Sequence, residues 1–479
     1  MPLKEKTMES KVIKKSLKIE IFSYFSVYSF SLFILIVSGL LAIFESNANT
    51  FYIGGWDMLV YICLLAPLIW LIKNQKIRNP YTKYFLPILV VLMIDVFYYS
   101  NAFVQSILPI IIFIIIVTLY LTSMHKVEYF YQTLIPRFHI PFKFVSYIKE
   151  FSSNLISLNM HRTLYMRIGI ALLVTIPFLG LFSALFMSAD ENFSLAVKSL
   201  FTFKSFFDFS TIIGIPFYFF GYLSLFIYGF SNAMKRVNIE TTKAFDPVII
   251  GIFLGMLNIL FVTFLLFQIS YFFGGESYIK TSGINLAEYA REGFFQLMWV
   301  MGIVVMIVLT IMRRFKGEKV IAFLMSGLIL QTMVMGFSSL KKMYLYQEIK
   351  GATVLRYYVE WLDYFLLFIL GLGLYYIVRK HSFHSLLNTI AIVSLLALSV
   401  VASTNIDNMV ANHNIEKFKN SPAKLDKMSI SSLSVDALPA IQNTDIKIVL
   451  YQKRECEIFS QYHFGYCQKL KLYGKEHVK

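Results

Sequence analysis

Eleven apolar runs divide the chain, each near the length that an α-helix needs to cross a lipid bilayer. A helix rises about 1.5 Å per residue, so roughly 20 residues cross a hydrocarbon core about 30 Å thick. Unpaired backbone groups are costly in lipid, and the ten-residue alternating strands of a membrane barrel are absent from the sequence. We therefore expect an all-α integral membrane protein with about eleven transmembrane helices. The predicted spans are 24–44, 56–73, 84–100, 103–124, 164–188, 207–232, 247–274, 290–312, 320–340, 357–378 and 385–403.

The composition supports a multi-pass membrane protein and excludes a set of soluble domains. Hydrophobic residues make up 57% of the 479 residues, and charged residues make up only 15%. The net charge of +16 resembles that of a nucleic-acid-binding protein. However, the Lys and Arg residues are scattered through short segments between the apolar runs, which is how membrane topology is encoded. We expect membrane lipids as partners and no nucleic acid.

The basic residues also predict the orientation of the chain. With the N-terminus in the cytoplasm, the inner segments hold 24 Lys and Arg residues and the outer loops hold 8. An odd number of spans then places the C-terminus outside the cytoplasm. The first apolar run is longer than the roughly 7 to 15 residues of a signal-peptide core, so we expect an uncleaved span. The predicted regions are a cytoplasmic basic N-terminus (1–23), a four-helix membrane region (24–124), a cytoplasmic amphipathic loop (125–163), a seven-helix membrane region (164–403) and an extracytoplasmic tail domain (404–479).

Two segments between the predicted spans have unusual patterns. The inner loop 125–163 mixes aromatic residues with Lys and Arg, a pattern typical of amphipathic helices on an anionic leaflet. A solvated linker is the alternative. The outer segment 341–356 carries four basic residues, against the charge rule. Either the topology differs at this segment or its charges have a function.

The tail is predicted to be small and mainly helical. We expect one helix over 405–418, capped by Asn405 or Thr404, and a second over 445–464 that ends before Gly465. The tail holds two cysteines, Cys456 and Cys467. On one straight helix their Cα atoms would lie about 16 Å apart, beyond the roughly 5.5 Å of a disulfide, but a turn at Gly465 would bring them together. A disulfide suits a tail outside the cytoplasm, and two free thiols are the alternative.

The sequence lacks the zinc-helix, phosphate-loop and nucleophile-elbow motifs of common enzymes. Its eight histidines are dispersed, so we expect no metal, no cofactor and no catalytic residue of a soluble enzyme type. Ionisable residues gather instead toward the outer ends of spans. Glu288, Arg291 and Glu292 share one helix face by spacing, and Arg356, Glu360 and Asp363 repeat this pattern on another predicted span.

Charged side chains near the bilayer are expensive, at least about 2.5 to 3.5 kcal/mol at its centre, so they should face one another or a wet cavity. We therefore predict an outward-facing polar vestibule that binds a ligand. The alternative is that these residues form local helix pairs that mark the membrane interface. The candidate ligand-binding residues are Asp190, Glu288, Arg291, Glu292, Lys342, Arg356 and Glu360.

Three segments together resemble a known family. They are FGGESYIKTSGINLAEYAREGFFQL (273–297), PFLGLFSALFMSADENF (177–193) and SSLKKMYLYQEIKGATVLR (338–356), and the tail pieces NIDNMVANHNI and LSVDALPAI also fit. The sequence resembles bacterial multi-span membrane proteins known as domain of unknown function 4173, with a sister family numbered 4153. Where that family commonly has Arg, this chain has Lys342, which lacks the bidentate fork of Arg. The resemblance implies a location in the bacterial cytoplasmic membrane and brings no activity.

These features lead to three hypotheses of function. In the first, the vestibule binds an anionic or zwitterionic envelope ligand or lipid for transport or sensing. Arg291, Lys342 and Arg356 would supply the positive charge in that case. In the second, the protein is a scaffold or sensory subunit that docks a protein partner through 125–163 or 404–479. The third and least favoured is an intramembrane enzyme that uses Asp190 or Glu288 as acid or base.

Overall fold

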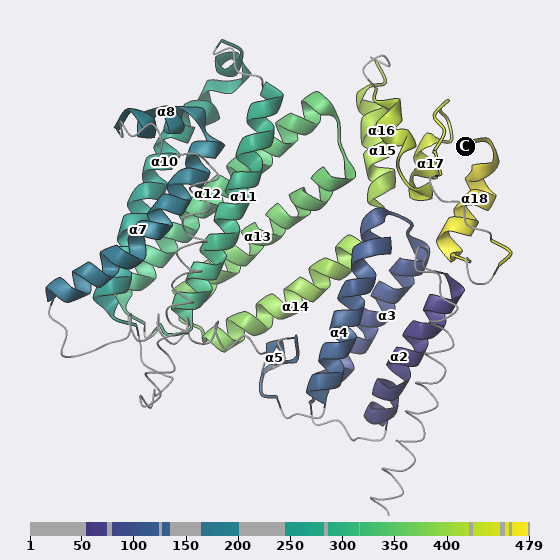
Figure 1. The fold of residues 1–479 in the computed structure, drawn as a ribbon, viewed down its shortest axis with the longest axis horizontal. Helices are drawn as coiled ribbons and strands as arrows, with labels where there is room; N and C mark the ends of the chain where they lie inside the picture. Colours follow the sequence, from purple (N-terminus) through teal and green to yellow (C-terminus); the bar gives the residue numbers. More distant parts are fainter. Residues whose placement is uncertain are drawn as a thin grey trace, which may run out of the picture. The chain divides into compact units, whose positions relative to one another are not determined.

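The computed structural model describes ten stretches of the chain. These are residues 54–73, 79–123, 127–134, 164–200, 245–281, 286–315, 317–420, 425–450, 456–458 and 462–477. The elements in these stretches are helices (Figure 1). The chain divides into two compact units, one made of residues 1–136 with 395–479 and the other of residues 137–394.

The unit that contains residues 137–394 is a bundle of long apolar helices. Its elements are α7 (Leu164–Ala189), α8 (Glu191–Leu200), α10 (Pro247–Thr281), α11 (Leu286–Met312), α12 (Lys319–Lys350), α13 (Val354–Val378) and the first half of α14 (Phe383–Ala402). Helix α12 packs against α10, α11 and α13, and α7 packs against α10 and α11. Aromatic rings fill the contact between α7 and α10, where Phe186 stacks on Phe264 with 4.1 Å between ring centroids.

The outer faces of these helices stay apolar. Ile259, Met306 and Phe323 are 68%, 65% and 76% exposed. A soluble bundle would carry polar residues on such faces, whereas a bundle in lipid does not need them. Six helices are long and apolar enough to cross a membrane, namely those over 164–189, 247–268, 293–312, 319–350, 354–378 and 383–402. The chain is therefore a helical membrane protein.

Nine of the eleven predicted spans overlap described helices, and the runs 24–44 and 207–232 lie outside the described residues. The apolar helical stretches 57–70 and 103–119 are shorter than the six long ones. The number of eleven therefore stays a prediction. Of the amphipathic loop 125–163, the structure describes only residues 127–134, which contain the short helix α5 (Tyr131–Leu134).

Helix α12 is longer than its sequence predicted. We expected a span to Leu340 followed by a loop, but the helix continues to Lys350 and measures 32 residues, or about 48 Å. The added turns consist of residues with good helix propensity, and the first breaker is Gly351, at φ 77°. Thr353 then caps α13 by accepting a hydrogen bond from the backbone N–H of Arg356. The predicted outer loop is thus a helical extension with a short turn.

The unit that contains the two chain ends combines apolar helices with the tail. Its elements are α2 (Gly55–Lys73), α3 (Thr82–Tyr98), the π-helix η1 (Phe103–Ile107), α4 (Leu108–Ser123), α5, the end of α14, α15 (Ile406–Lys417), α16 (Lys427–Ser431), the 3-10 helix η3 (Val435–Ala437), α17 (Leu438–Ile441) and α18 (Phe464–His477). Figure 1 shows the tail helices gathered at the end of the unit where α3 ends and α4 begins. The tail has its own buried apolar core, which includes Ile430, Val435, Leu438, Ile441, Ile448 and Tyr466.

One tail helix is where the sequence placed it and the other is not. Helix α15 matches the first prediction, and the side chain of Asn405 caps it by accepting from the N–H of Asn408. The second predicted helix, 445–464, is wrong, because α18 begins at Phe464 and contains Gly465. A Cβ atom at Gly465 would overlap with the carbonyl group of Tyr98 at the end of α3. This glycine therefore permits a close helix approach instead of ending a helix.

We predict that Gly465→Ala loosens the tail from α3. The added methyl group meets backbone, which cannot turn aside as a side chain can, and overpacking of this kind costs about 1–3 kcal/mol. Faster cleavage of the tail in limited proteolysis of the full-length protein in detergent would measure this effect. Gly255→Ala is the control, since a Cβ there meets nothing within 4 Å. Equal cleavage of both variants would contradict the prediction.

Candidate functional site

Four of the seven predicted ligand-binding residues have described side chains, and each of the four makes specific contacts in the bundle of residues 137–394. Asp190 lies between α7 and α8 and is 1% exposed. Its Oδ1 accepts a hydrogen bond of 3.0 Å from the N–H of Phe193, which is the arrangement of a helix N-cap. Its Oδ2 is buried and has no partner at standard hydrogen-bond geometry within the described residues. Burial raises the pKa of this carboxyl above its ordinary value, while the α8 N–H groups and Lys342 oppose that rise.

Lys342, on the extended part of α12, is a buried cation. It is 6% exposed, and its Nζ donates a 3.0 Å hydrogen bond to the carbonyl oxygen of Ala189. Lys342 also interacts electrostatically with Asp190, which directly follows Ala189 in the sequence. Lys342, one of the four basic residues of 341–356 that depart from the topology rule, therefore lies inside the protein. There it joins α12 to the junction of α7 and α8.

Gly293 of α11 makes this contact possible. A Cβ atom at this position would overlap with the Nζ of Lys342 and lie 2.8 Å from the carbonyl oxygen of Ala189. The sequence signal for this residue was the small position in YAREGFFQL, which our sequence analysis quoted without assigning it a role. Three helices thus converge on one buried ammonium group.

Arg356 and Glu360 do not form the helix pair that their spacing allows. Arg356 donates to the carbonyl oxygen of Gly351, and its guanidinium lies 4.1 Å from the ring centroid of Tyr346. Glu360 accepts a 3.0 Å hydrogen bond from the side-chain amide of Gln347. These contacts fasten α12 to α13 at the turn between them. The arginine itself has no carboxylate partner in the described part of the chain.

Three predicted residues lie beyond what the structure describes in side-chain detail. Glu288, Arg291 and Glu292 fall in the first turns of α11, so their backbone is helical as expected. Their side chains are outside the described residues.

The sequence analysis missed a second buried charge cluster, in the unit that holds the tail. Asp436, in η3, is fully buried and accepts hydrogen bonds from the N–H groups of Ser100 (2.6 Å) and Asn101 (3.1 Å). Its other oxygen accepts from the Nζ of Lys469 on α18, at 2.6 Å. This ion pair ties two tail helices to the turn that follows α3. Its sequence signal was the aspartate of LSVDALPAI, a segment that entered only through the family resemblance.

His463 completes this contact at the start of α18. Its Nδ1 accepts a hydrogen bond from the N–H of Tyr466, and its Nε2 lies 2.9 Å from the carbonyl oxygen of Val96 in α3. The ring is therefore neutral and carries its proton on Nε2. It caps α18 and fixes that helix to α3.

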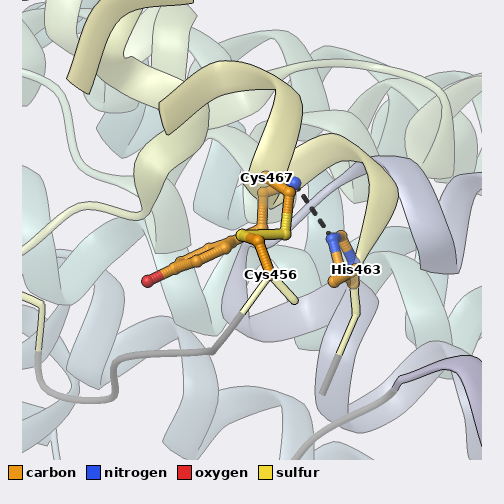
Figure 2. The surroundings of a disulfide bond; sticks show 4 residues. Cys456, His463 and Cys467 are labelled. Carbon is orange, nitrogen blue, oxygen red and sulfur yellow. Dashed lines mark hydrogen bonds between the residues drawn. A yellow bond between two sulfur atoms is a disulfide. The ribbon is translucent and has the colours of Figure 1, made fainter. Parts of the chain in front are cut away.

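A disulfide closes the end of the tail. Cys456 is bonded to Cys467 of α18, with 5.7 Å between their Cα atoms (Figure 2). The N–H of Cys467 donates to the carbonyl oxygen of His463, so the bridge lies one turn from the histidine cap. The pairing was left open by the sequence, and the remaining cysteine, Cys63 in α2, is free. No group of three His, Cys, Asp or Glu residues suited to a metal ion gathers within the described stretches.

The same unit contains an apolar cavity of about 530 Å³. Helices α2 and α3 form its walls, and Tyr462 and Phe464 of the tail close one end. Its volume falls within the range of small-molecule sites, and its lining is suited to hydrocarbon.

The apolar helices and their buried charges define a multi-pass helical membrane protein. The chain belongs to the family described as a domain of unknown function (DUF4153), which matches residues 32–444. This is the family that the sequence resemblance named as the sister family. No curated protein and no solved structure matches the chain.

We predict that Gly293→Ala disrupts the Lys342 contact. The methyl group displaces the ammonium from Ala189, so the variant should lose about 1–3 kcal/mol of stability, measured by thermal unfolding in detergent. Gly302→Ala on the same helix meets nothing within 4 Å and serves as the control.

A double-mutant cycle sharpens this test. In the Lys342→Ala background the ammonium is gone, so the further cost of Gly293→Ala should shrink. Equal costs of Gly293→Ala in both backgrounds would show that the glycine does not make room for the lysine.

Proposed function

We propose that this protein binds an anionic or zwitterionic envelope ligand or lipid at the charged end of the α7–α13 bundle, for transport or sensing. Lys342 and Arg356 supply the positive charge, with Arg291 as the third predicted cation. Glu288 and Glu292 are predicted to lie beside Arg291, Glu360 accepts a hydrogen bond from Gln347, and Asp190 interacts with Lys342.

The observation that carries this proposal is the state of Arg356. Among the described residues, its guanidinium is held by a carbonyl oxygen and an aromatic ring and not by a carboxylate. A phosphate or carboxylate could therefore bind it without first breaking a carboxylate ion pair. Planar bidentate recognition of such anions is the particular strength of arginine.

A lipid is favoured over a fully soluble anion by the surroundings of the site. The bundle has apolar outer faces that the acyl chains of a lipid can contact. An amphipathic ligand can use these faces together with the charged end of the same bundle.

We propose the bacterial cytoplasmic membrane as the location, with the N-terminus in the cytoplasm and the tail outside it. The tail disulfide supports this orientation, since disulfides persist in oxidising compartments and are rare in the cytosol. The distribution of Lys and Arg supports it independently.

The second candidate function is a scaffold or sensory subunit that docks a protein through 404–479 or 125–163. The specific observation in its favour is the tail itself, which has its own core, a disulfide and a buried ion pair whose aspartate also accepts hydrogen bonds from the turn after α3. A tail fixed in this way is suited to present a stable surface. An intramembrane enzyme remains third, because one oxygen of Asp190 is already used as a helix cap.

The test is mass spectrometry of the full-length protein extracted in native-lipid particles. We predict that an anionic or zwitterionic molecule copurifies with the wild type and is lost, by tenfold or more, in Arg356→Ala. Arg379→Ala is the matched control, because Arg379 is an exposed residue at the other end of α13.

Two other results are informative. Equal retention of the molecule by Arg356→Ala and the control would contradict the proposal that the ligand binds at Arg356. A stoichiometric protein partner that is lost when 404–479 is deleted, and retained in Arg356→Ala, would favour the scaffold.

A further inference from the structure

One buried carboxylate in the α7–α13 bundle has no cation beside it among the side chains that the structure describes. Asp363 lies in α13, inside a membrane-spanning segment, about 14 Å along the helix from its first residue. It is 0% exposed, and within the described residues neither of its oxygens has a partner at standard hydrogen-bond geometry. The hydroxyl group of Ser339 on α12 interacts with this carboxyl group.

Another fully buried aspartate of the same bundle shows what an ionised group needs. Asp246 caps α10 by accepting from the N–H of Val248, and its second oxygen lies 3.2 Å from the Nε of Arg167. A buried carboxylate without such donors costs several kcal/mol and becomes neutral by binding a proton. The surroundings of Asp363 therefore suit a carboxylic acid and not a carboxylate.

The neighbouring polar groups form a short chain that can accept this proton's hydrogen bond. Ser339 is fully buried, and its hydroxyl lies 3.5 Å from the carbonyl oxygen of Phe294 in α11. A protonated Asp363 can donate to Ser339, which donates in turn to Phe294. Three helices thus meet at one acid, one hydroxyl and one carbonyl.

Few charged groups lie around this position among the described side chains, which do not include those of Glu288, Arg291 and Glu292 on α11. On α13 itself, Glu360 lies one turn away and disfavours a second negative charge, and Tyr357 and Tyr364 flank it. On α12, Lys342 is three residues beyond Ser339 and interacts with Asp190. The described part of α11 beyond Gly293 contains no titratable residue.

The helices pack closely next to this site. Gly336 of α12 lies against Leu367 of α13 and Met301 of α11, and a Cβ at Gly336 would come within 2.6 Å of both side chains. A small separation of α13 from α12 would admit water at Asp363, and hydration would lower the free-energy cost of the ionised carboxylate. Intramembrane carboxyls that alternate between dry and wet surroundings are the usual elements of proton relays.

We propose that Asp363 is a proton-binding site, which releases and rebinds its proton as the α12–α13 contact opens and closes. The ligand of this site is the proton itself. This inference is independent of the envelope ligand proposed above, since it concerns a different residue and would stand if Arg356 bound nothing.

Infrared spectroscopy of the full-length protein in lipid tests this proposal. We expect a carboxylic-acid C=O band at neutral pH that is absent in Asp363→Asn and present in the control Asp246→Asn. The band should shift in D₂O and decrease as the pH is raised. Ser339→Ala should keep the band and move it to higher frequency, because the hydrogen bond to the acid is lost.

Two outcomes would overturn the proposal. Absence of an Asp363-dependent band at neutral pH would show that the residue is ionised. A band that resists both D₂O exchange and alkaline titration would show a permanently locked acid with no exchange function. If Asp363→Asn does not fold, the shift caused by Ser339→Ala still identifies the band.

Discussion

Burial of charge in an apolar bundle is the constraint on which the rest of this structure depends. An ion without a partner there costs several kcal/mol, so each buried charge determines where its neighbours lie. Lys342 draws α12 to the end of α7, and Lys469 joins α18 to Asp436 and the turn after α3. Asp363 is the exception, because no cation among the described side chains pairs with it, and this makes it a functional candidate.

Glycine is the second part of this arrangement. Gly293 and Gly465 each lie where a side chain would overlap with a buried contact, the first with Lys342 and the second with Tyr98. The glycines let the backbones come close enough for a lysine to reach a partner on another helix. Charge and close packing are therefore coupled, and a change to either one should disturb the other.

Hydropathy alone predicted most helix positions, because a run of about 20 apolar residues in lipid has few alternatives. It misplaced the end of α12, since Lys341 and Lys342 look like loop residues until a partner for Lys342 is known. It also misplaced the second tail helix, because Gly465 suggests a helix end as readily as a close contact. The pair Asp436 and Lys469 is separated by 33 residues, and no local pattern connects them. Contacts of this kind arise only from the tertiary fold.

The central claim is that the disulfide-closed tail lies outside the cytoplasm, on the turn after α3. Labelling of the Cys63→Ser variant with a membrane-impermeant maleimide, in cells whose cytoplasmic membrane is intact, tests it most directly. We predict no labelling before treatment with an impermeant reductant and labelling of Cys456 and Cys467 after it. Labelling that requires cell lysis would place the tail in the cytoplasm and contradict the claim.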